Sequence, residues 1–265
     1  MVITTLLNDQ TFLADVSCDS WEDLVDIAGA PLVREGSVEP GFLQSIKDTV
    51  VKYGSYMVLV DDVALFHGRP EAGAHEIAMS LALLSRPVYV QDKRVKAAFV
   101  FAAVDNDSHL ELLRELARGL ADDELLRLLR NGGSREDVLR RFAIAEESMK
   151  CVECDGVGGT ADRNEKTTTE RDMKILCVCG LGMGSSLILK MTVEKAMQQI
   201  GIPCDVEHQA AGTMSGINAD LIVAAQDFAD ELAGRDNVVL VTNIVKTDEV
   251  KAKIEAFLEE TGVLT

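Results

Sequence analysis

The chain has 265 residues, 47% of them hydrophobic, and a formal net charge of −18 at pH 7. Because domains usually hold about 100–200 residues, this length predicts two domains, each with enough apolar side chains for a core. The strongly acidic balance repels phosphate backbones and therefore excludes nucleic acid as an expected partner.

The first part of the chain, residues 1–150, is predicted to form an α/β layered domain with a mixed sheet. Capping residues, a proline in a first turn and regular leucine spacing predict helices at residues 20–33, 40–52, 108–120 and 134–149. Apolar runs bounded by turn residues predict strands at residues 56–60, 63–66, 77–85 and 95–104.

The second part, residues 173–265, is predicted to form a small doubly wound sheet, mostly parallel, with flanking helices. Its strands are expected at residues 174–179, 203–207, 220–224 and 237–241, and its helices at residues 185–200, 227–233 and 247–260. Residues 151–172, between the two domains, are rich in glycine, threonine and charge, which indicates a linker.

No apolar run approaches the roughly 18 residues that a membrane-spanning helix needs, and the N-terminus lacks a signal-peptide pattern. The six cysteines show no disulfide spacing, so we expect free thiols in a cytoplasmic protein. Cys151 and Cys154 form a CxxC, but no second ligand pair accompanies them, which favours no functional role. We predict no metal and no cofactor.

The run KILCVCGLGMGSSL, residues 174–187, is typical of a strand, a glycine-rich turn and the start of a helix. Backbone N–H groups in such a turn converge with the positive end of the helix dipole and bind an anion, most plausibly phosphate. Cys179 lies at the beginning of the turn, where its thiolate is favoured. Cys177 is expected to face the core. The segment therefore predicts a cysteine that carries a phosphoryl group.

Two other classes of protein also use a glycine-rich turn after a strand. A dinucleotide site needs glycine or alanine where Ser185 stands, although Glu207 lies where a ribose acceptor would be. A cysteine phosphatase needs an arginine that closes the loop, and residues 180–189 contain none. Both alternatives are therefore disfavoured.

His67 follows an apolar run and precedes Gly68, Arg69 and a proline, which predicts a turn at a strand end. Such a turn exposes the imidazole, and Gly68 allows another backbone to approach closely. Neutral imidazole accepts a phosphoryl group because its pKa lies near about 6.5, and Arg69 would stabilise the phosphate charge. The alternative is a hydrogen-bonded surface histidine, and the sequence favours neither.

His109 follows the strand predicted at residues 95–104 and begins a helix, where the helix dipole stabilises an anion. If that strand lies beside the strand at residues 63–66, His67 and His109 meet at one edge of the sheet. His75 and His208 lack such a context and are predicted to be surface residues.

These segments resemble a fused enzyme IIA–IIB protein of the bacterial sugar phosphotransferase system, of the ascorbate type. CVCGLGMGSSLILKMTVEKAMQQIGI, residues 177–202, is similar to the phosphocysteine loop and first helix of the ascorbate-family IIB component. ALFHGRPEAG, residues 64–73, is similar to the phosphohistidine loop of mannitol/ascorbate-class IIA, and AAVDNDSHLELL, residues 102–113, to the segment with its second histidine.

The resemblance implies that His67 is the IIA phosphoryl acceptor, that His109 binds or orients the phosphate, and that Cys179 is the IIB acceptor. It also implies that the turn after Cys179 holds the phosphate, largely through backbone N–H groups. The residues of that turn are Gly180, Leu181, Gly182, Met183, Gly184, Ser185 and Ser186.

Two positions depart from the family pattern. The family loop commonly has proline before the histidine and alanine after it, where this chain has Phe66 and Gly68. The mannitol branch uses an arginine in the preceding helix, whereas GFLQSIKDTV has none, and Arg69 is a candidate substitute. These departures weaken a mannitol assignment more than an ascorbate assignment.

The implied function is a phosphoryl relay from the phosphocarrier HPr to His67, to Cys179 and then to an L-ascorbate-like sugar. A separate membrane permease, component IIC, would bind the sugar and hold the cytoplasmic protein at the membrane. The alternative is a regulatory module that signals sugar supply through its phosphorylation state. The sequence leaves the oligomeric state open, homo-oligomers included.

Overall fold

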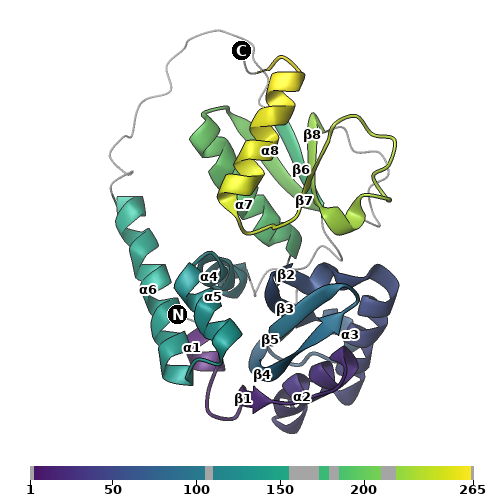
Figure 1. Ribbon diagram of the computed structural model, residues 1–265, viewed down its shortest axis with the longest axis vertical. Helices are drawn as coiled ribbons and strands as arrows, with labels where there is room; N and C mark the ends of the chain where they lie inside the picture. Colours follow the sequence, from purple (N-terminus) through teal and green to yellow (C-terminus); the bar gives the residue numbers. More distant parts are fainter. Residues whose placement is uncertain (1–2, 105–109, 155–172, 179–184, 210–218, 264–265) are drawn as a thin grey trace.

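The computed structural model describes residues 3–104, 110–154, 173–178, 185–209 and 219–263. These residues form two separate sheets, one of five strands and one of four, each packed against helices (Figure 1). The five-stranded sheet lies in the first part of the chain and the four-stranded sheet in the second. The predicted α/β class is therefore confirmed for both parts.

The first sheet is mixed and has the strand order β1-β4-β5-β3-β2. Its strands are β1 (Phe12–Val16), β2 (Val58–Val60), β3 (Asp62–His67), β4 (Ala78–Val90) and β5 (Lys93–Ala102). The pairs β1–β4 and β3–β5 are parallel, whereas β2–β3 and β4–β5 are antiparallel. The carboxyl end of β3 therefore lies beside that of β5, which is the condition under which the sequence analysis expects the two histidine-bearing segments to meet.

Helices cover both faces of this sheet. They are α1 (Ile3–Leu6), α2 (Trp21–Arg34), α3 (Pro40–Tyr53), α4 (Leu110–Leu120), α5 (Asp123–Asn131) and α6 (Arg135–Cys154), with 3₁₀ turns η1 (Ser55–Met57) and η2 (Pro70–Ala72). In Figure 1, α2 and α3 lie on one side of the sheet and the α4–α6 group on the other. The Ser20 hydroxyl caps α2 by accepting the Asp23 N–H, as predicted.

Three elements of the first domain, α1, β1 and α5, were not predicted, and two, β4 and α6, are longer than predicted. β1 has only five residues, and its apolar alternation is interrupted by Asp15, whose φ is 53°. α5 has nine residues, although Asp122 and the left-handed Gly132 are the capping signals that delimit it. α6 extends to Cys154 rather than ending at residue 149, so the predicted linker begins inside a helix.

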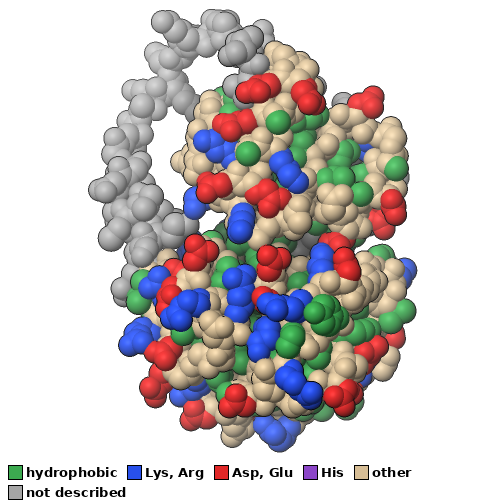
Figure 2. Space-filling model, in the orientation of Figure 1, with side chains coloured by type: hydrophobic (Ala, Val, Ile, Leu, Met, Phe, Trp, Pro, Cys, Tyr) green, Lys and Arg blue, Asp and Glu red, His purple; other side chains and the backbone are tan. Residues whose placement is uncertain are grey.

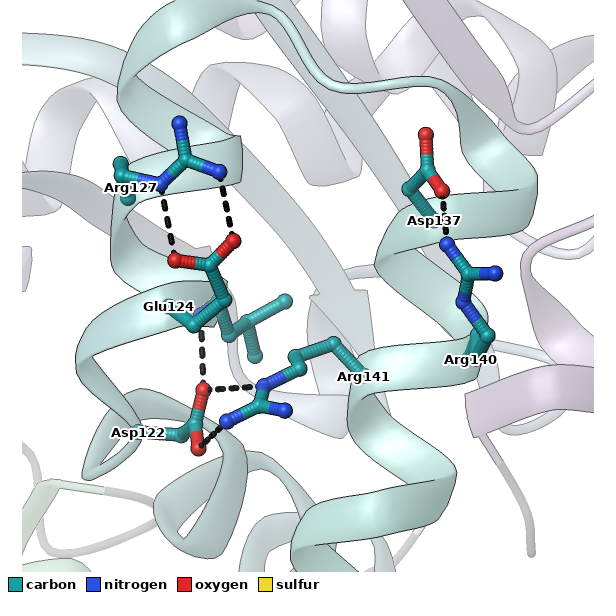
Figure 3. Close-up of polar contacts among 7 residues, drawn as sticks. Asp122, Glu124, Arg127, Asp137, Arg140 and Arg141 are labelled. Carbon is teal, nitrogen blue, oxygen red and sulfur yellow. Dashed lines mark hydrogen bonds and ion pairs between the residues drawn. The ribbon is translucent and has the colours of Figure 1, made fainter.

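An ion pair between Asp122 and Arg141 connects the start of α5 to α6 (Figure 3). The Asp122 carboxylate accepts the Leu125 N–H at 2.8 Å and both Nε and Nη2 of Arg141 at 2.8 Å. Partial burial acts to raise the pKa of Asp122, but the hydrogen bonds from Arg141 and Leu125 outweigh it and hold that pKa below its usual value. A second pair, Glu124 with Arg127, lies on the exposed side of α5.

The second sheet has the order β7-β6-β8-β9 and is parallel throughout. Its elements are β6 (Met173–Val178), α7 (Ser185–Ile200), β7 (Cys204–Gln209), β8 (Leu221–Ala225), the 3₁₀ turn η4 (Gln226–Phe228), β9 (Val238–Val241) and α8 (Thr247–Glu260). Helices α7 and α8 pack against each other and against the sheet. The predicted strands and these two helices are confirmed.

The prediction of a helix at residues 227–233 is wrong. Only the 3₁₀ turn η4 forms there, and turns follow it. Phe228 and Leu232 have a helical spacing and are buried, but a segment this short gains too little from propagation to offset the cost of nucleation. No helix in the described part of the chain is long and apolar enough to span a bilayer.

Candidate functional site

His67 is the last residue of β3, where it pairs with Phe101 of the parallel strand β5. Parallel strands present their carboxyl ends at the same edge of a sheet, which is where ligands of α/β proteins bind. The two strands that the sequence analysis considered as possible neighbours do lie side by side. His109, the second predicted histidine, lies outside the described residues.

The ring of His67 is held in one orientation. Its Nδ1 lies 3.0 Å from the Leu65 carbonyl oxygen, which can only accept, so Nδ1 carries the proton and Nε2 the lone pair in the neutral ring. The Tyr56 ring meets the imidazole edge to face, with centroids 6.0 Å apart. This tautomer makes Nε2 the nucleophilic nitrogen.

The prediction that a turn exposes His67 is wrong, because the residue is only 3% exposed. His67 ends a strand rather than lying in a turn, and Tyr56 covers one side of its ring. Tyr56 in turn contacts Phe228 of the second domain, with ring centroids 6.1 Å apart. The histidine therefore lies beneath side chains that reach the other domain.

Gly68 permits close packing behind the histidine. A Cβ at this position would lie 2.8 Å from Cε2 of Phe42 and 3.0 Å from Oγ of Ser45, both in α3. The departure from the family's alanine therefore has a structural reason, since the Phe42 ring occupies the space of a methyl group. Arg69, the predicted phosphate partner, is exposed directly after this glycine.

The second predicted site begins where β6 ends at Val178 and continues to Ser185, the first residue of α7. The segment between them lies outside the described residues and contains Cys179, Gly180, Leu181, Gly182, Met183 and Gly184. Cys177, two residues before it, is fully buried in the sheet, which confirms that it faces the core.

Ser186 is fully buried in the first turn of α7, and its Oγ lies 3.3 Å from Nδ1 of His208. His208 lies on β7, paired with Cys177 of the strand that leads to the predicted loop. The residue is exposed overall, as predicted for a surface histidine. Loss of water around the ring, with the nearby Lys190 charge, lowers the pKa of His208 below 6.5.

This contact was missed from the sequence. The available signal was the position of His208 on the strand after the glycine-rich turn, which in a parallel sheet lies next to the strand before that turn. Neutral His208 either accepts the Ser186 proton or donates to its oxygen, depending on the tautomer. It therefore decides whether the serine hydroxyl has a proton to donate to a bound anion.

The described residues contain no group of three or more metal-binding side chains. Cys151 and Cys154 lie in the last turn of α6, and their side chains are outside the described part of the structure. His75 lies on the surface, as predicted, with its Nε2 at 3.5 Å from the Glu39 carboxylate.

A cavity of about 540 Å³ lies between the two domains. Its walls come from β2, β3 and β5 in the first domain and from the segment around the start of α8 in the second. Lys and Arg side chains gather on the face of the first domain that is seen in Figure 2. Arg94, which lines the cavity, and Arg130 both pair with the buried Asp62. His67 is not among the lining residues, so the cavity is separate from the predicted phosphoryl site.

Curated and solved relatives match the first domain. The mannitol-specific cryptic phosphotransferase enzyme IIA component of Escherichia coli (strain K12) is 32% identical over 124 residues, which are 46% of this chain and 84% of that protein. The ascorbate-specific PTS system EIIA component of Shigella boydii serotype 4 (strain Sb227) is 30% identical over 139 residues, 51% of this chain and 90% of that protein. The solution structure of the mannitol-specific cryptic phosphotransferase enzyme IIA CmtB from Escherichia coli matches with 27% identity and a TM-score of 0.48, over 54% of this chain and 98% of that one.

Two family models match, one for each domain. Residues 174–256 match the model described as PTS system, Lactose/Cellobiose specific IIB subunit. Residues 5–144, more than half of the chain, match the model described as Phosphoenolpyruvate-dependent sugar phosphotransferase system, EIIA 2. The chain therefore belongs to the EIIA 2 family of the phosphoenolpyruvate-dependent sugar phosphotransferase system, and it is a phosphotransferase component in which an EIIA domain is followed by a IIB domain.

Proposed function

We propose that the chain relays a phosphoryl group from phosphorylated HPr to His67, then to Cys179, and finally to a sugar bound by a separate IIC permease. The observation that carries this proposal is the tautomer of His67. Its Nδ1 faces the Leu65 carbonyl at 3.0 Å, which leaves the Nε2 lone pair as the nucleophile.

The first step transfers the phosphoryl group to His67. Nε2 attacks phosphorus as the bond to the carrier's nitrogen breaks, and the positive charge that develops on the ring is stabilised through the Nδ1–H bond to Leu65. Because the ring is already oriented, little conformational freedom is lost when the reaction occurs. In this proposal Arg69 and His109 bind the phosphate oxygens.

The second step transfers the group to Cys179. The thiolate attacks phosphorus, the S–P bond forms, and the N–P bond breaks with its electron pair returning to Nε2. The residues from Gly180 to Ser186 hold the phosphate through backbone N–H groups and the positive end of the α7 dipole. Support for this role comes from the position of Cys179 directly after β6 and shortly before α7.

The proposed sugar is ascorbate-like. Support comes from the ascorbate-specific EIIA relative, from the missing arginine in α3 and from the sequence of the glycine-rich loop. The match of the second domain to a lactose/cellobiose IIB model makes a different sugar the competing outcome. We further propose that residues 151–172 link domains 1–150 and 173–265, and that the cytoplasmic chain meets the membrane through IIC.

The test supplies phosphoenolpyruvate, enzyme I and HPr to the wild type and to Cys179→Ser. Phosphorus NMR should show phosphohistidine at Nε2 in both proteins, and phosphocysteine only in the wild type. With membranes that contain an ascorbate-type IIC, only the wild type should phosphorylate ascorbate. Sugar phosphorylation by Cys179→Ser, or phosphohistidine at Nδ1, would contradict the proposed chemistry.

A further inference from the structure

One short segment of the second domain contacts the first domain close to His67. Asp227 and Phe228 are adjacent residues of η4, which follows β8 and lies next to the first domain in Figure 1. The Asp227 carboxylate lies 2.7 Å from Nζ of Lys93, the first residue of β5. The Phe228 ring meets the Tyr56 ring of η1, with centroids 6.1 Å apart. A charged contact and an aromatic contact thus come from consecutive residues.

The aromatic contact leads directly to the phosphoryl acceptor. Tyr56 has the His67 ring on one side, at 6.0 Å, and the Phe228 ring on another, at 6.1 Å. All three residues are at most 3% exposed. The second domain therefore contacts a residue that packs directly against His67, rather than a distant surface.

The aromatic contact resembles the buried centre of a protein interface, and the charged contact resembles its partly exposed rim. Phe228 and Tyr56 are excluded from water, whereas the side chains of Lys93 and Asp227 keep 30% and 22% of their exposure. Buried aromatic pairs supply most of the binding energy at interfaces, and partly exposed charge pairs fix register and partner choice. This arrangement is that of a specific docking surface between the domains.

We infer that Lys93–Asp227 and Tyr56–Phe228 form a latch that docks the IIB domain on the IIA domain of the same chain, so that phosphoryl transfer to Cys179 runs within one chain. This inference rests on the proposed relay. Its partner is the chain's own second domain. Covalent connection gives that domain an effective concentration in the millimolar range, without any new contact.

The latch also sets the order of events. The second domain packs on Tyr56, the residue beside the buried His67, so a docked IIB domain and an external phosphocarrier compete for this face of the first domain. Loading and forward transfer therefore belong to two different arrangements of the chain. The latch stabilises the arrangement for transfer and competes with the phosphocarrier for the same face.

A charge exchange tests the latch in the full-length chain. Rapid quench after loading of His67 measures the rate constant for transfer to Cys179 in Lys93→Glu, in Asp227→Lys and in the double exchange. Each single reversal should slow transfer about tenfold, because like charges then face each other, and the double exchange should recover the wild-type rate within about twofold. The wild-type rate constant should not depend on protein concentration.

The matched control exchanges a pair of similar length inside the first domain. Asp26 and Lys47 lie 2.6 Å apart between α2 and α3, so Asp26→Lys with Lys47→Glu should leave the transfer rate unchanged. Circular dichroism and the extent of His67 loading check that every variant is folded.

Three results overturn the inference: single reversals that transfer at the wild-type rate, a double exchange as slow as the singles, or a rate proportional to protein concentration. The last result would assign transfer to two different chains. Absence of phosphocysteine in a wild type whose His67 is phosphorylated would instead refute the proposed relay itself, so the two failures are distinguishable.

Discussion

The two proposed phosphoryl acceptors of this chain are each associated in the sequence with the end of a strand, one in each sheet, yet their surroundings differ. His67 is itself the last residue of β3, and its ring is fixed by the Leu65 carbonyl and by Tyr56. Cys179 comes after the last residue of β6, and α7 begins at Ser185. We propose that the first acceptor depends on side-chain packing, whereas the second depends on the glycine-rich residues that follow it and on the polar groups at the start of α7.

This difference predicts which substitutions should impair each acceptor. Added volume near His67 should impair the first acceptor, because close-packed interiors do not accommodate an extra methyl group. Loss of a hydroxyl or a change of charge near α7 should impair the second acceptor, because anion binding there is electrostatic.

The largest effect is expected for Gly68→Ala. The new methyl group would lie 2.8 Å from the Phe42 ring, so the variant should lose about 1–3 kcal/mol of stability and load His67 more slowly. Trp21, the single tryptophan, lies in α2 of the first domain, so its fluorescence during urea unfolding reports on that domain. Gly41→Ala is the control, because no atom lies within 4 Å of its Cβ position. Equal behaviour of the two variants would contradict packing as the basis of the first site.

The next effect is expected for Ser186→Ala. If its buried hydroxyl binds the phosphate on Cys179, its loss should lower phosphocysteine formation about tenfold, the cost of one hydrogen bond to a charged group. Phosphohistidine should be unchanged. Thr192→Val, which removes a hydroxyl bonded to the Ile188 carbonyl inside the same helix, should have no effect on either product. A matching loss in both variants would show that the helix, rather than the hydroxyl, was damaged.

A smaller effect, on the first domain alone, is expected for Asp122→Ala. The variant loses the N-cap of α5 and the bond to Arg141, which should cost about 1 kcal/mol by Trp21 fluorescence. Phosphocysteine formation should be normal once His67 is loaded. Glu124→Gln removes only an exposed pair and should leave the unfolding midpoint unchanged. A loss of phosphocysteine in Asp122→Ala would show that the two sites are not independent.

The smallest effect is expected on the pH dependence of folding stability, through the titration of His208. Its folded pKa lies below 6.5, so between the two pKa values the unfolded chain binds more protons and stability rises with pH. The contribution is fully present above the unfolded pKa and is lost as pH falls through the folded pKa. NMR titration should place the His208 midpoint below 6.5, and Lys190→Gln should raise it because a nearby positive charge is removed. If the titration midpoint of His208 is the same in Lys190→Gln as in the wild type, the contribution assigned to the Lys190 charge is contradicted.

The sequence predicted the elements whose signals are local. The helix that begins at Ser185, the capped helix after Ser20 and the β-branched strands all appear where the pattern indicated. The strands before His67 and His109 were each predicted, whereas their side-by-side position was only considered as a condition and comes from the structure. The predicted features depend on period, capping and turn chemistry, which neighbouring residues carry.

Features that depend on contacts between distant segments were not predicted. His67 is buried and packs against Tyr56, which comes from another element and which itself contacts Phe228 in the other domain. The contact of Ser186 with His208 requires the register of two parallel strands, which no local pattern specifies. Packing of this kind decides which residues of a recognisable motif are accessible.

The most direct test of the relay supplies phosphoenolpyruvate, enzyme I and HPr to the full-length His67→Ala protein, with no other IIA component present. The wild type should carry label on both His67 and Cys179, and His67→Ala should carry no label on Cys179, because in the proposed relay Cys179 receives its phosphoryl group only from the histidine. Label on Cys179 in His67→Ala would contradict the relay.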